Sequence, residues 1–117
     1  MSLETKQVVD RHLAALMERD LVKLVDHYAE DAFFLSNLTP GPVRGQDALR
    51  QLWTQILTIL TPEVLATLTL LQQQVEGDVA YLKWSASPVI PFGVDTLVVR
   101  NGKIVAHTTG VEIAGSE

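Results

Sequence analysis

The chain has 117 residues, with 14 acidic and 9 basic side chains and a formal net charge of −5. Hydrophobic residues make up 47% and charged residues 20%, a balance typical of a folded globular protein rather than a disordered one. We therefore expect residues 1–117 to form a single domain. The lack of cysteine excludes disulfides, thiolate nucleophiles and cysteine-based zinc sites. The acidic balance and the scattered cations exclude nucleic acid as the expected partner.

The sequence predicts neither a secretory signal nor a membrane-spanning segment. The first six residues lack the charged-then-apolar layout of a secretory signal. The longest apolar stretch, residues 56–71, is interrupted by threonines and by Pro62-Glu63, which makes it unsuited to span a bilayer. We therefore expect a cytoplasmic protein without a membrane partner.

The first half of the chain has the hydrophobic period of amphipathic helices. The stripe of a first helix consists of Val8, Val9, His12, Leu13, Ala15 and Leu16. Asp20 is placed to cap a second, short helix, whose apolar face consists of Leu21, Leu24, Val25 and Tyr28. Residues 32–35 suit a short strand. A third helix is expected from about Gly45 to Thr61-Pro62, with a buried face of Ala48, Leu49, Leu52, Trp53, Ile56 and Leu57.

The second half has the composition of strands. We expect strands over residues 64–75, 79–87, 93–100 and 103–113, with Pro88 and Pro91 marking a bulge or an edge. Asn101-Gly102 between two apolar runs predicts a tight hairpin, because both turn residues need a positive φ. Helices followed by antiparallel strands indicate the α+β class, with a sheet covered by helices on one face.

Four segments together carry a family resemblance. They are residues 8–21, 28–32, 44–50 and 95–105, which read VVDRHLAALMERDL, YAEDA, RGQDALR and DTLVVRNGKIV. In this order and spacing they resemble the SnoaL-like and ketosteroid-isomerase-like branch of the nuclear-transport-factor-2-like superfamily. The resemblance implies a cone-shaped, strongly curved antiparallel sheet packed on three helices of the N-terminal half and enclosing a pocket. That superfamily includes isomerases, polyketide cyclases, dehydratases, epoxide hydrolases and proteins that only bind, so fold alone does not decide function.

The resemblance also assigns positions in the pocket. The general base of ketosteroid isomerases falls on Ser36, and a serine hydroxyl cannot take a proton from carbon without a partner base. The tyrosine and the neutral acid of their oxyanion hole fall on His12 and Asp95. Two of the three positions are therefore polar, but the base of the ketosteroid isomerase reaction is missing.

The last strand supplies another acid–base candidate. Val105, His107, Thr109 and Val111 share one side of it, so His107 lies beside Asp95 if that side faces the interior. A His12–Asp95 or a His107–Asp95 pair would hold an imidazole in one tautomer, ready to exchange protons near neutral pH. The candidate catalytic residues are therefore His12, Asp95 and His107.

Structural interpretations of the same residues stay open. His12 suits a core histidine bonded to a backbone carbonyl, and Asp95 suits the cap of a turn after Gly93. His107 would instead point outward if its strand presents the other face to the core. His27, next to an aspartate, is expected to face solvent.

The candidate ligand-binding residues are Tyr28, Phe34, Ser36, Trp53 and Trp84. The aromatic side chains are expected to form the pocket wall, with the Tyr28 hydroxyl at its wet end, and Ser36 is expected to be a passive hydroxyl. The three histidines come one per element, without the spacing of a metal site, and no glycine-rich phosphate loop is present. We therefore expect neither a metal nor a cofactor.

Two classes of function remain. The first is a cofactor-free isomerase, cyclase or dehydratase that acts on a small cyclic or polyketide-like compound. The second is a non-catalytic module that binds a small apolar molecule in the same pocket or dimerises. A homodimer through the sheet face is expected, because a strand presents an alternating exposed set on one side: Thr67, Thr69, Leu71 and Gln73.

Overall fold

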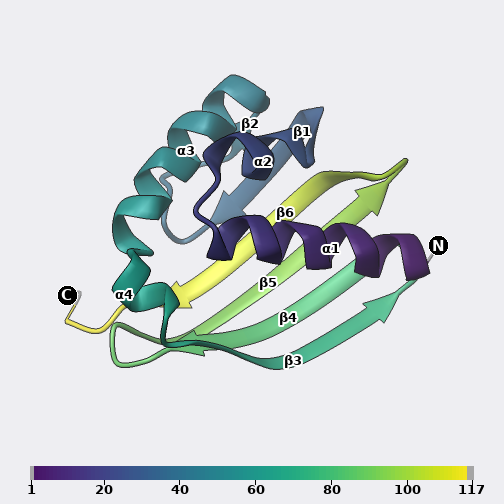
Figure 1. Ribbon diagram of the computed structural model, residues 1–117. Helices are drawn as coiled ribbons and strands as arrows, with labels where there is room; N and C mark the ends of the chain where they lie inside the picture. Colours follow the sequence, from purple (N-terminus) through teal and green to yellow (C-terminus); the bar gives the residue numbers. More distant parts are fainter. Residues whose placement is uncertain (1, 116–117) are drawn as a thin grey trace.

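The computed structural model describes residues 2–115 and has α+β architecture. Its helices are α1 (Ser2–Met17), α2 (Leu21–Asp26), α3 (Gln46–Ile59) and α4 (Pro62–Leu65). Its strands are β1 (Tyr28–Ser36), β2 (Val43–Arg44), β3 (Leu68–Glu76), β4 (Val79–Ala86), β5 (Ile90–Arg100) and β6 (Lys103–Glu112). Figure 1 shows a curved, unclosed sheet with the helices on its concave side, as the resemblance implied. The strand order is β2-β1-β6-β5-β4-β3.

The sheet is antiparallel except where β1 meets β6. Strands β3 to β6 form a meander of hairpins, whereas β1 pairs with β6 in parallel and places Phe34 opposite His107. The expectation of an antiparallel sheet therefore fails at this one junction, which joins segments far apart in the sequence. The predicted hairpin turn between β5 and β6 is confirmed, because Asn101 and Gly102 both have a positive φ, of 52° and 75°.

The helices bury the faces that their periodicity predicted. In α1 the buried residues are Thr5, Val8, Val9, His12, Ala15 and Leu16, and in α3 they are Leu49, Leu52, Trp53, Ile56 and Leu57. Asp20 caps α2 as expected, because its carboxylate accepts a hydrogen bond from the Lys23 amide at 3.1 Å. Within residues 2–115, no helix has both the length and the hydropathy needed to cross a bilayer.

Several expected boundaries differ: β1 is longer than the strand expected at residues 32–35, and β5 begins at Ile90 rather than at residue 93. Two further boundaries are wrong for local reasons. Tyr28 does not belong to α2, because that helix ends at Asp26 and Tyr28 begins β1. Residues 64 and 65 do not begin a strand, because they belong to the one-turn helix α4 in the described chain. The Thr61 hydroxyl accepts a hydrogen bond from the Val64 amide, and Pro62 occupies the first helical turn, where a missing amide proton costs nothing.

A bulge in β3 changes the face of its second half. Thr67, Thr69 and Leu71 are exposed as expected. The register shifts between Leu70 and Gln72, however, so Gln73 pairs with Leu82 on the inner face. The predicted four-residue alternation is therefore wrong at Gln73, because one extra residue reverses the phase of a strand. Dimerisation through the outer face stays a prediction.

Candidate functional site

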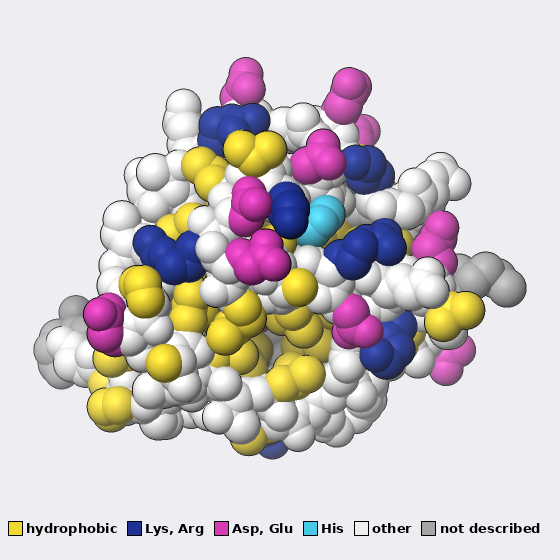
Figure 2. All heavy atoms as spheres, in the orientation of Figure 1, with side chains coloured by type: hydrophobic (Ala, Val, Ile, Leu, Met, Phe, Trp, Pro, Cys, Tyr) yellow, Lys and Arg dark blue, Asp and Glu magenta, His cyan; other side chains and the backbone are white. Residues whose placement is uncertain are grey.

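A mainly apolar pocket lies between the helices and the inner face of the sheet. Its cavity measures about 130 Å³. Figure 2 shows hydrophobic side chains gathered around a hollow on this face of the molecule. The wall is formed by Leu13, Leu16, Met17, Phe34, Leu38, Trp53, Ile56, Ile59, Leu60, Leu68, Leu70, Leu82, Trp84, Ile90, Asp95, Thr109, Val111 and Ile113. Asp95 is the single ionisable side chain in this lining, and Thr109 is its other polar member.

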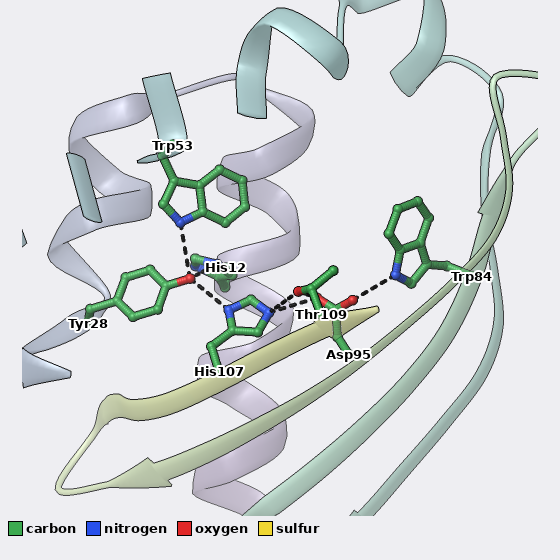
Figure 3. A network of polar contacts seen from close by, with 7 residues as sticks. All are labelled: His12, Tyr28, Trp53, Trp84, Asp95, His107 and Thr109. Carbon is green, nitrogen blue, oxygen red and sulfur yellow. Dashed lines mark hydrogen bonds and ion pairs between the residues drawn. The ribbon is translucent and has the colours of Figure 1, made fainter. Parts of the chain in front are cut away.

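Asp95 stands on β5 and accepts three hydrogen bonds (Figure 3). Its Oδ1 accepts the indole N–H of Trp84 at 2.9 Å. Its Oδ2 lies 2.7 Å from Nε2 of His107 and accepts the Thr109 hydroxyl at 3.1 Å. The β5–β6 register explains this cluster, because it places Asp95 directly opposite Thr109. The Asp95 side chain remains 15% exposed, which leaves it accessible from the pocket.

The predicted contact between His107 and Asp95 is therefore present, and His107 and Thr109 face inward as expected. The predicted alternation of β6 is wrong at Ile104, which is fully buried because the register shifts between Val98 and Val99 and leaves Val105 as an extra residue. His107 is 2% exposed, and its ring lies 4.7 Å from that of Phe34 between centroids. Its second nitrogen, Nδ1, lies 2.7 Å from the Tyr28 hydroxyl. Because an ionised carboxylate only accepts hydrogen bonds, we assign the imidazole proton to Nε2, which leaves Nδ1 to accept the Tyr28 proton.

Tyr28 lies at the centre of the network rather than at a wet end of the pocket. It is fully buried, and its hydroxyl oxygen accepts the indole N–H of Trp53 at 3.1 Å. The same oxygen lies 3.5 Å from Nε2 of His12. Burial raises the pKa of Tyr28 well above its ordinary value, so the side chain stays a neutral phenol. The expectation of a solvent-facing hydroxyl is wrong, because Tyr28 begins β1 beneath α1 and α3.

Two further histidines continue the network away from the pocket. His12, on α1, is 4% exposed, and its Nδ1 lies 3.1 Å from Nδ1 of His27. Burial lowers the pKa of His12 well below its usual value, and the nearby His107 and His27 lower it further. His27 is only half-exposed. The prediction that it faces solvent is wrong for Nδ1, because this nitrogen contacts His12. Partial burial, and then the neighbouring Arg11, lower the pKa of His27.

The candidate residues therefore divide into three groups. Phe34, Trp53 and Trp84 line the pocket together with Asp95, as expected. His107, Tyr28 and His12 lie behind that wall, and His12 meets Asp95 through Tyr28 and His107 rather than directly. Ser36 is elsewhere: its hydroxyl accepts the Leu38 amide at 3.0 Å in the turn after β1.

The sequence interpretation missed three contributors to the site. Thr109 was recognisable, because it follows His107 by two residues on the same strand face. His27 had no local signal, since its contact with His12 depends on how α1 packs beside the end of α2. Gly93 had no local sequence signal either. A Cβ at this position would lie 2.5 Å from the Trp84 ring, so the glycine leaves room for the indole that donates to Asp95.

Among residues 2–115, no three His, Asp or Glu side chains lie close enough together to hold a metal ion. The histidines do not converge on one point. His27 contacts His12 directly, and His12 is linked to His107 through Tyr28, as Figure 3 shows for the last three residues. This arrangement suits the exchange of protons.

The curved sheet, the helices on its concave side and the enclosed pocket define a nuclear-transport-factor-2-like fold. Residues 9–107 match the SnoaL-like domain, and the chain belongs to this family. Members of the wider superfamily include isomerases and cyclases. No curated protein sequence matches the chain.

Solved structures share the fold at low sequence identity. A SnoaL-like protein of unknown function from Burkholderia thailandensis E264 has a TM-score of 0.77 at 14% identity, covering 96% of this chain and 97% of that one. An NTF-2 like protein of unknown function from Burkholderia xenovorans LB400 has a TM-score of 0.74 at 21% identity, covering 97% and 87%. A putative ketosteroid isomerase from Kribbella flavida DSM 17836 has a TM-score of 0.73 at 16% identity, covering 99% and 83%. These similarities establish the fold alone.

Proposed function

We propose that this protein is a cofactor-free acid–base enzyme, an isomerase, cyclase or dehydratase acting on a small cyclic or polyketide-like compound. Asp95 exchanges the proton with the substrate, and His107 supports it from behind. The observation that carries this proposal is the position of Asp95, the one ionisable side chain in the apolar lining, 2.7 Å from a buried imidazole.

The chemistry follows from the free lone pair of the carboxylate. Oδ1 of Asp95 accepts one hydrogen bond, from Trp84, and retains room for a second partner. It can take a proton from a carbon next to a carbonyl, while the electron pair of the broken C–H bond moves into the carbonyl as an enolate. Return of the proton to another carbon gives isomerisation, and its transfer to a leaving hydroxyl gives dehydration.

The size and polarity of the cavity limit the substrate. An apolar cavity on the order of 150 Å³ holds one benzene ring. A cavity of about 130 Å³ therefore fits a compound with roughly one ring. Since Asp95 and Thr109 lie together on one wall, the ligand needs a polar group on one side only. A small cyclic ketone meets these requirements.

The geometry does not support the ketosteroid isomerase reaction itself. Ser36 is engaged in a turn and lies outside the pocket lining. His12, at the position of the oxyanion tyrosine, lies behind the pocket wall in contact with His27 and Tyr28, and Asp95 accepts three hydrogen bonds instead of offering a proton. The two oxyanion donors of that reaction are therefore missing, and in the reaction proposed here the Thr109 hydroxyl, the other polar group of the lining, can turn from Asp95 to donate to the enolate oxygen.

A binding module is the second candidate function, and one observation favours it. In the described chain, every buried side-chain nitrogen or oxygen already has a hydrogen-bond partner. A pocket whose polar groups satisfy one another can hold an apolar molecule without any chemistry.

Carbon-bound deuterium exchange tests both candidates. A panel of small cyclic ketones is incubated with the protein in D₂O, and loss of the α-proton signals is followed by NMR. We expect the wild type to accelerate exchange and Asp95→Asn to lose about two to four orders of magnitude of that acceleration. Asp78→Asn is the control, because this carboxylate pairs with Arg100 on the surface. Ketone binding with equal exchange in wild type and Asp95→Asn would reject the enzyme and support the binding module.

A further inference from the structure

We propose that His27 is the solvent end of a proton relay that runs through His12, Tyr28 and His107 to Asp95. The proposal rests on the acid–base function above, because it describes how the proton of Asp95 is exchanged with water. It adds His27, a residue outside the pocket, to the machinery of the site.

The relay follows four consecutive contacts. Nδ1 of His27 lies 3.1 Å from Nδ1 of His12, whose Nε2 lies 3.5 Å from the Tyr28 hydroxyl. That hydroxyl lies 2.7 Å from Nδ1 of His107, whose Nε2 lies 2.7 Å from Asp95. Figure 3 shows the inner four members, His12, Tyr28, His107 and Asp95, next to one another. His12 and His107 use both ring nitrogens in these contacts, and His27 uses Nδ1, which leaves its Nε2 for solvent. A relay requires two working nitrogens in each ring.

The hydrogen bonds can all point in one direction. With Asp95 ionised, His107 donates from Nε2 and accepts the Tyr28 proton at Nδ1. The Tyr28 oxygen then accepts from Nε2 of His12, and Nδ1 of His12 accepts from Nδ1 of His27. Every member thus donates towards Asp95, and no imidazole has to be charged.

A proton taken up at Nε2 of His27 moves inward by one transfer at each contact. Each imidazole gains a proton on one nitrogen and releases one from the other, so each ring ends neutral in its other tautomer. Tyr28 gains a proton from His12 as it gives one to His107, because its raised pKa disfavours a tyrosinate. The net result is one proton removed from solvent and one added to Asp95. All donors then point outward, which is the arrangement needed for the reverse transfer.

The outer end of the relay is open to water. No partner binds Nε2 of His27, and no buried nitrogen in the described chain lacks a partner, so this atom lies at the surface. Figure 2 shows a histidine side chain at the surface among basic and acidic groups. His12 and His107, by contrast, are 4% and 2% exposed.

Partial burial, and then the surrounding charges, lower the pKa of His27 and keep it in the neutral form that a relay needs. Arg11 on α1, Lys23 on α2 and Lys103 on β6 lower its pKa, whereas Asp26 raises it. Lys103 also donates to the Asp26 carbonyl at 2.7 Å and lies 4.0 Å from its carboxylate. Partial burial is the largest cause of the lowered pKa, so His27 is mainly uncharged at neutral pH.

The pocket itself offers no equivalent route. Its lining is apolar except for Asp95 and Thr109. A bound substrate would cover Asp95 from that side and exclude water from it. A path behind the wall allows Asp95 to recover or lose its proton while the pocket is occupied.

The test needs no substrate. In histidine ¹⁵N-labelled protein, NMR gives the tautomer of each ring and the exchange rate of the His107 Nε2 proton with water. We expect the proton on Nδ1 in His27 and on Nε2 in His12 and His107. His27→Gln, which keeps a hydrogen-bonding amide but cannot pass a proton through, should slow the exchange severalfold. If exchange with water broadens the His107 Nε2 proton signal in the wild type, a sharper signal in His27→Gln also indicates slower exchange.

Two further variants complete the design. Tyr28→Phe interrupts the relay while His27 stays intact, and it should also slow the exchange of the His107 Nε2 proton. Arg50→Gln removes an exposed charge from α3 that is not among those acting on His27, and it should leave the rate unchanged. An unchanged rate in a folded His27→Gln protein would overturn the relay, and so would a wild-type His27 protonated on Nε2 alone.

The relay and the enzyme can fail separately. Slower His107 exchange in His27→Gln without Asp95-dependent ketone chemistry would retain the relay and reject the enzyme. Asp95-dependent ketone chemistry with unchanged His107 exchange in His27→Gln would retain the enzyme and reject the relay. For a ketone that the wild type does turn over, the relay predicts a lower kcat with little change in KM in His27→Gln, and its rescue by added imidazole buffer.

Discussion

The Tyr28 hydroxyl lies 2.7 Å from Nδ1 of His107, although 79 positions separate the two residues in the chain. This contact lies at the parallel junction of β1 and β6, and Trp53 of α3 joins it through its indole N–H. The polar network of the site therefore ties the helices to the sheet. Changes at its centre should affect stability as well as chemistry.

Tyr28→Phe should destabilise the protein by about 1–3 kcal/mol, because it leaves the buried Trp53 and His107 groups without their partner. Urea unfolding measures this change in the free energy of unfolding. Tyr81→Phe is the matched control, since Tyr81 is only half-buried and should change stability little. Equal effects of the two substitutions would contradict a structural role of the network.

Gly93→Ala should displace the Trp84 indole, because the new Cβ would lie 2.5 Å from its ring. The hydrogen bond from Trp84 to Asp95 should then weaken, with a shift of the indole N–H resonance and a change in tryptophan fluorescence. Gly110→Ala is the control, since its Cβ would meet Val94 at an ordinary 3.6 Å. Unchanged Trp84 signals in Gly93→Ala would show that the indole does not depend on this glycine.

Stability should fall as the pH drops below about 6.5, because folding lowers the pKa of His12. The unfolded chain then binds a proton that the folded state resists, so the contribution of neutral His12 is complete above pH 6.5. It declines by up to about 1.4 kcal/mol per pH unit until the folded pKa is reached. Urea unfolding between pH 5.5 and 7.5 measures the slope.

The variant His12→Gln should flatten this dependence. His27→Gln should change the pH dependence of stability less than His12→Gln does. His27 is half-exposed, so its charged form keeps part of its hydration. A slope in His12→Gln as steep as in the wild type would assign the pH dependence to other groups.

Asn37→Ala should loosen the end of β6 beside the pocket. The Asn37 side chain accepts the Val111 amide at 3.0 Å and donates to the Val111 carbonyl at 2.8 Å, as a neighbouring strand would. Its removal should accelerate hydrogen exchange of the Val111 amide, whereas the Leu97 amide, in the middle of the sheet, should exchange as before. Equal protection of Val111 in both proteins would mean that the side chain is dispensable there.

Local patterns accounted for much of the fold but for less of the site. The buried stripe of α1, the cap at Asp20 and the hairpin at Asn101-Gly102 depend on neighbours in sequence, so periodicity and turn chemistry predicted them. The contact of His107 with Asp95 does not follow from the turn alone, because the register of the two strands shifts by one residue between Val98 and Val99. Without this bulge Asp95 would lie opposite Thr108, and His107 would point to the other face of the sheet. Prediction failed at Gln73, where a bulge breaks the alternation without a sequence signal.

The sequence by itself determined the buried faces of α1 and α3 and which acid–base groups are present, since these follow from local period and residue type. Only the tertiary structure decided how those groups are connected. Tyr28 meets His107 because β1 and β6 pair in parallel, and His12 meets His27 because α1 lies against the end of α2. Such contacts depend on the packing of elements that are distant along the chain. For that reason the line of proton-carrying groups from the surface to Asp95 becomes visible only in three dimensions.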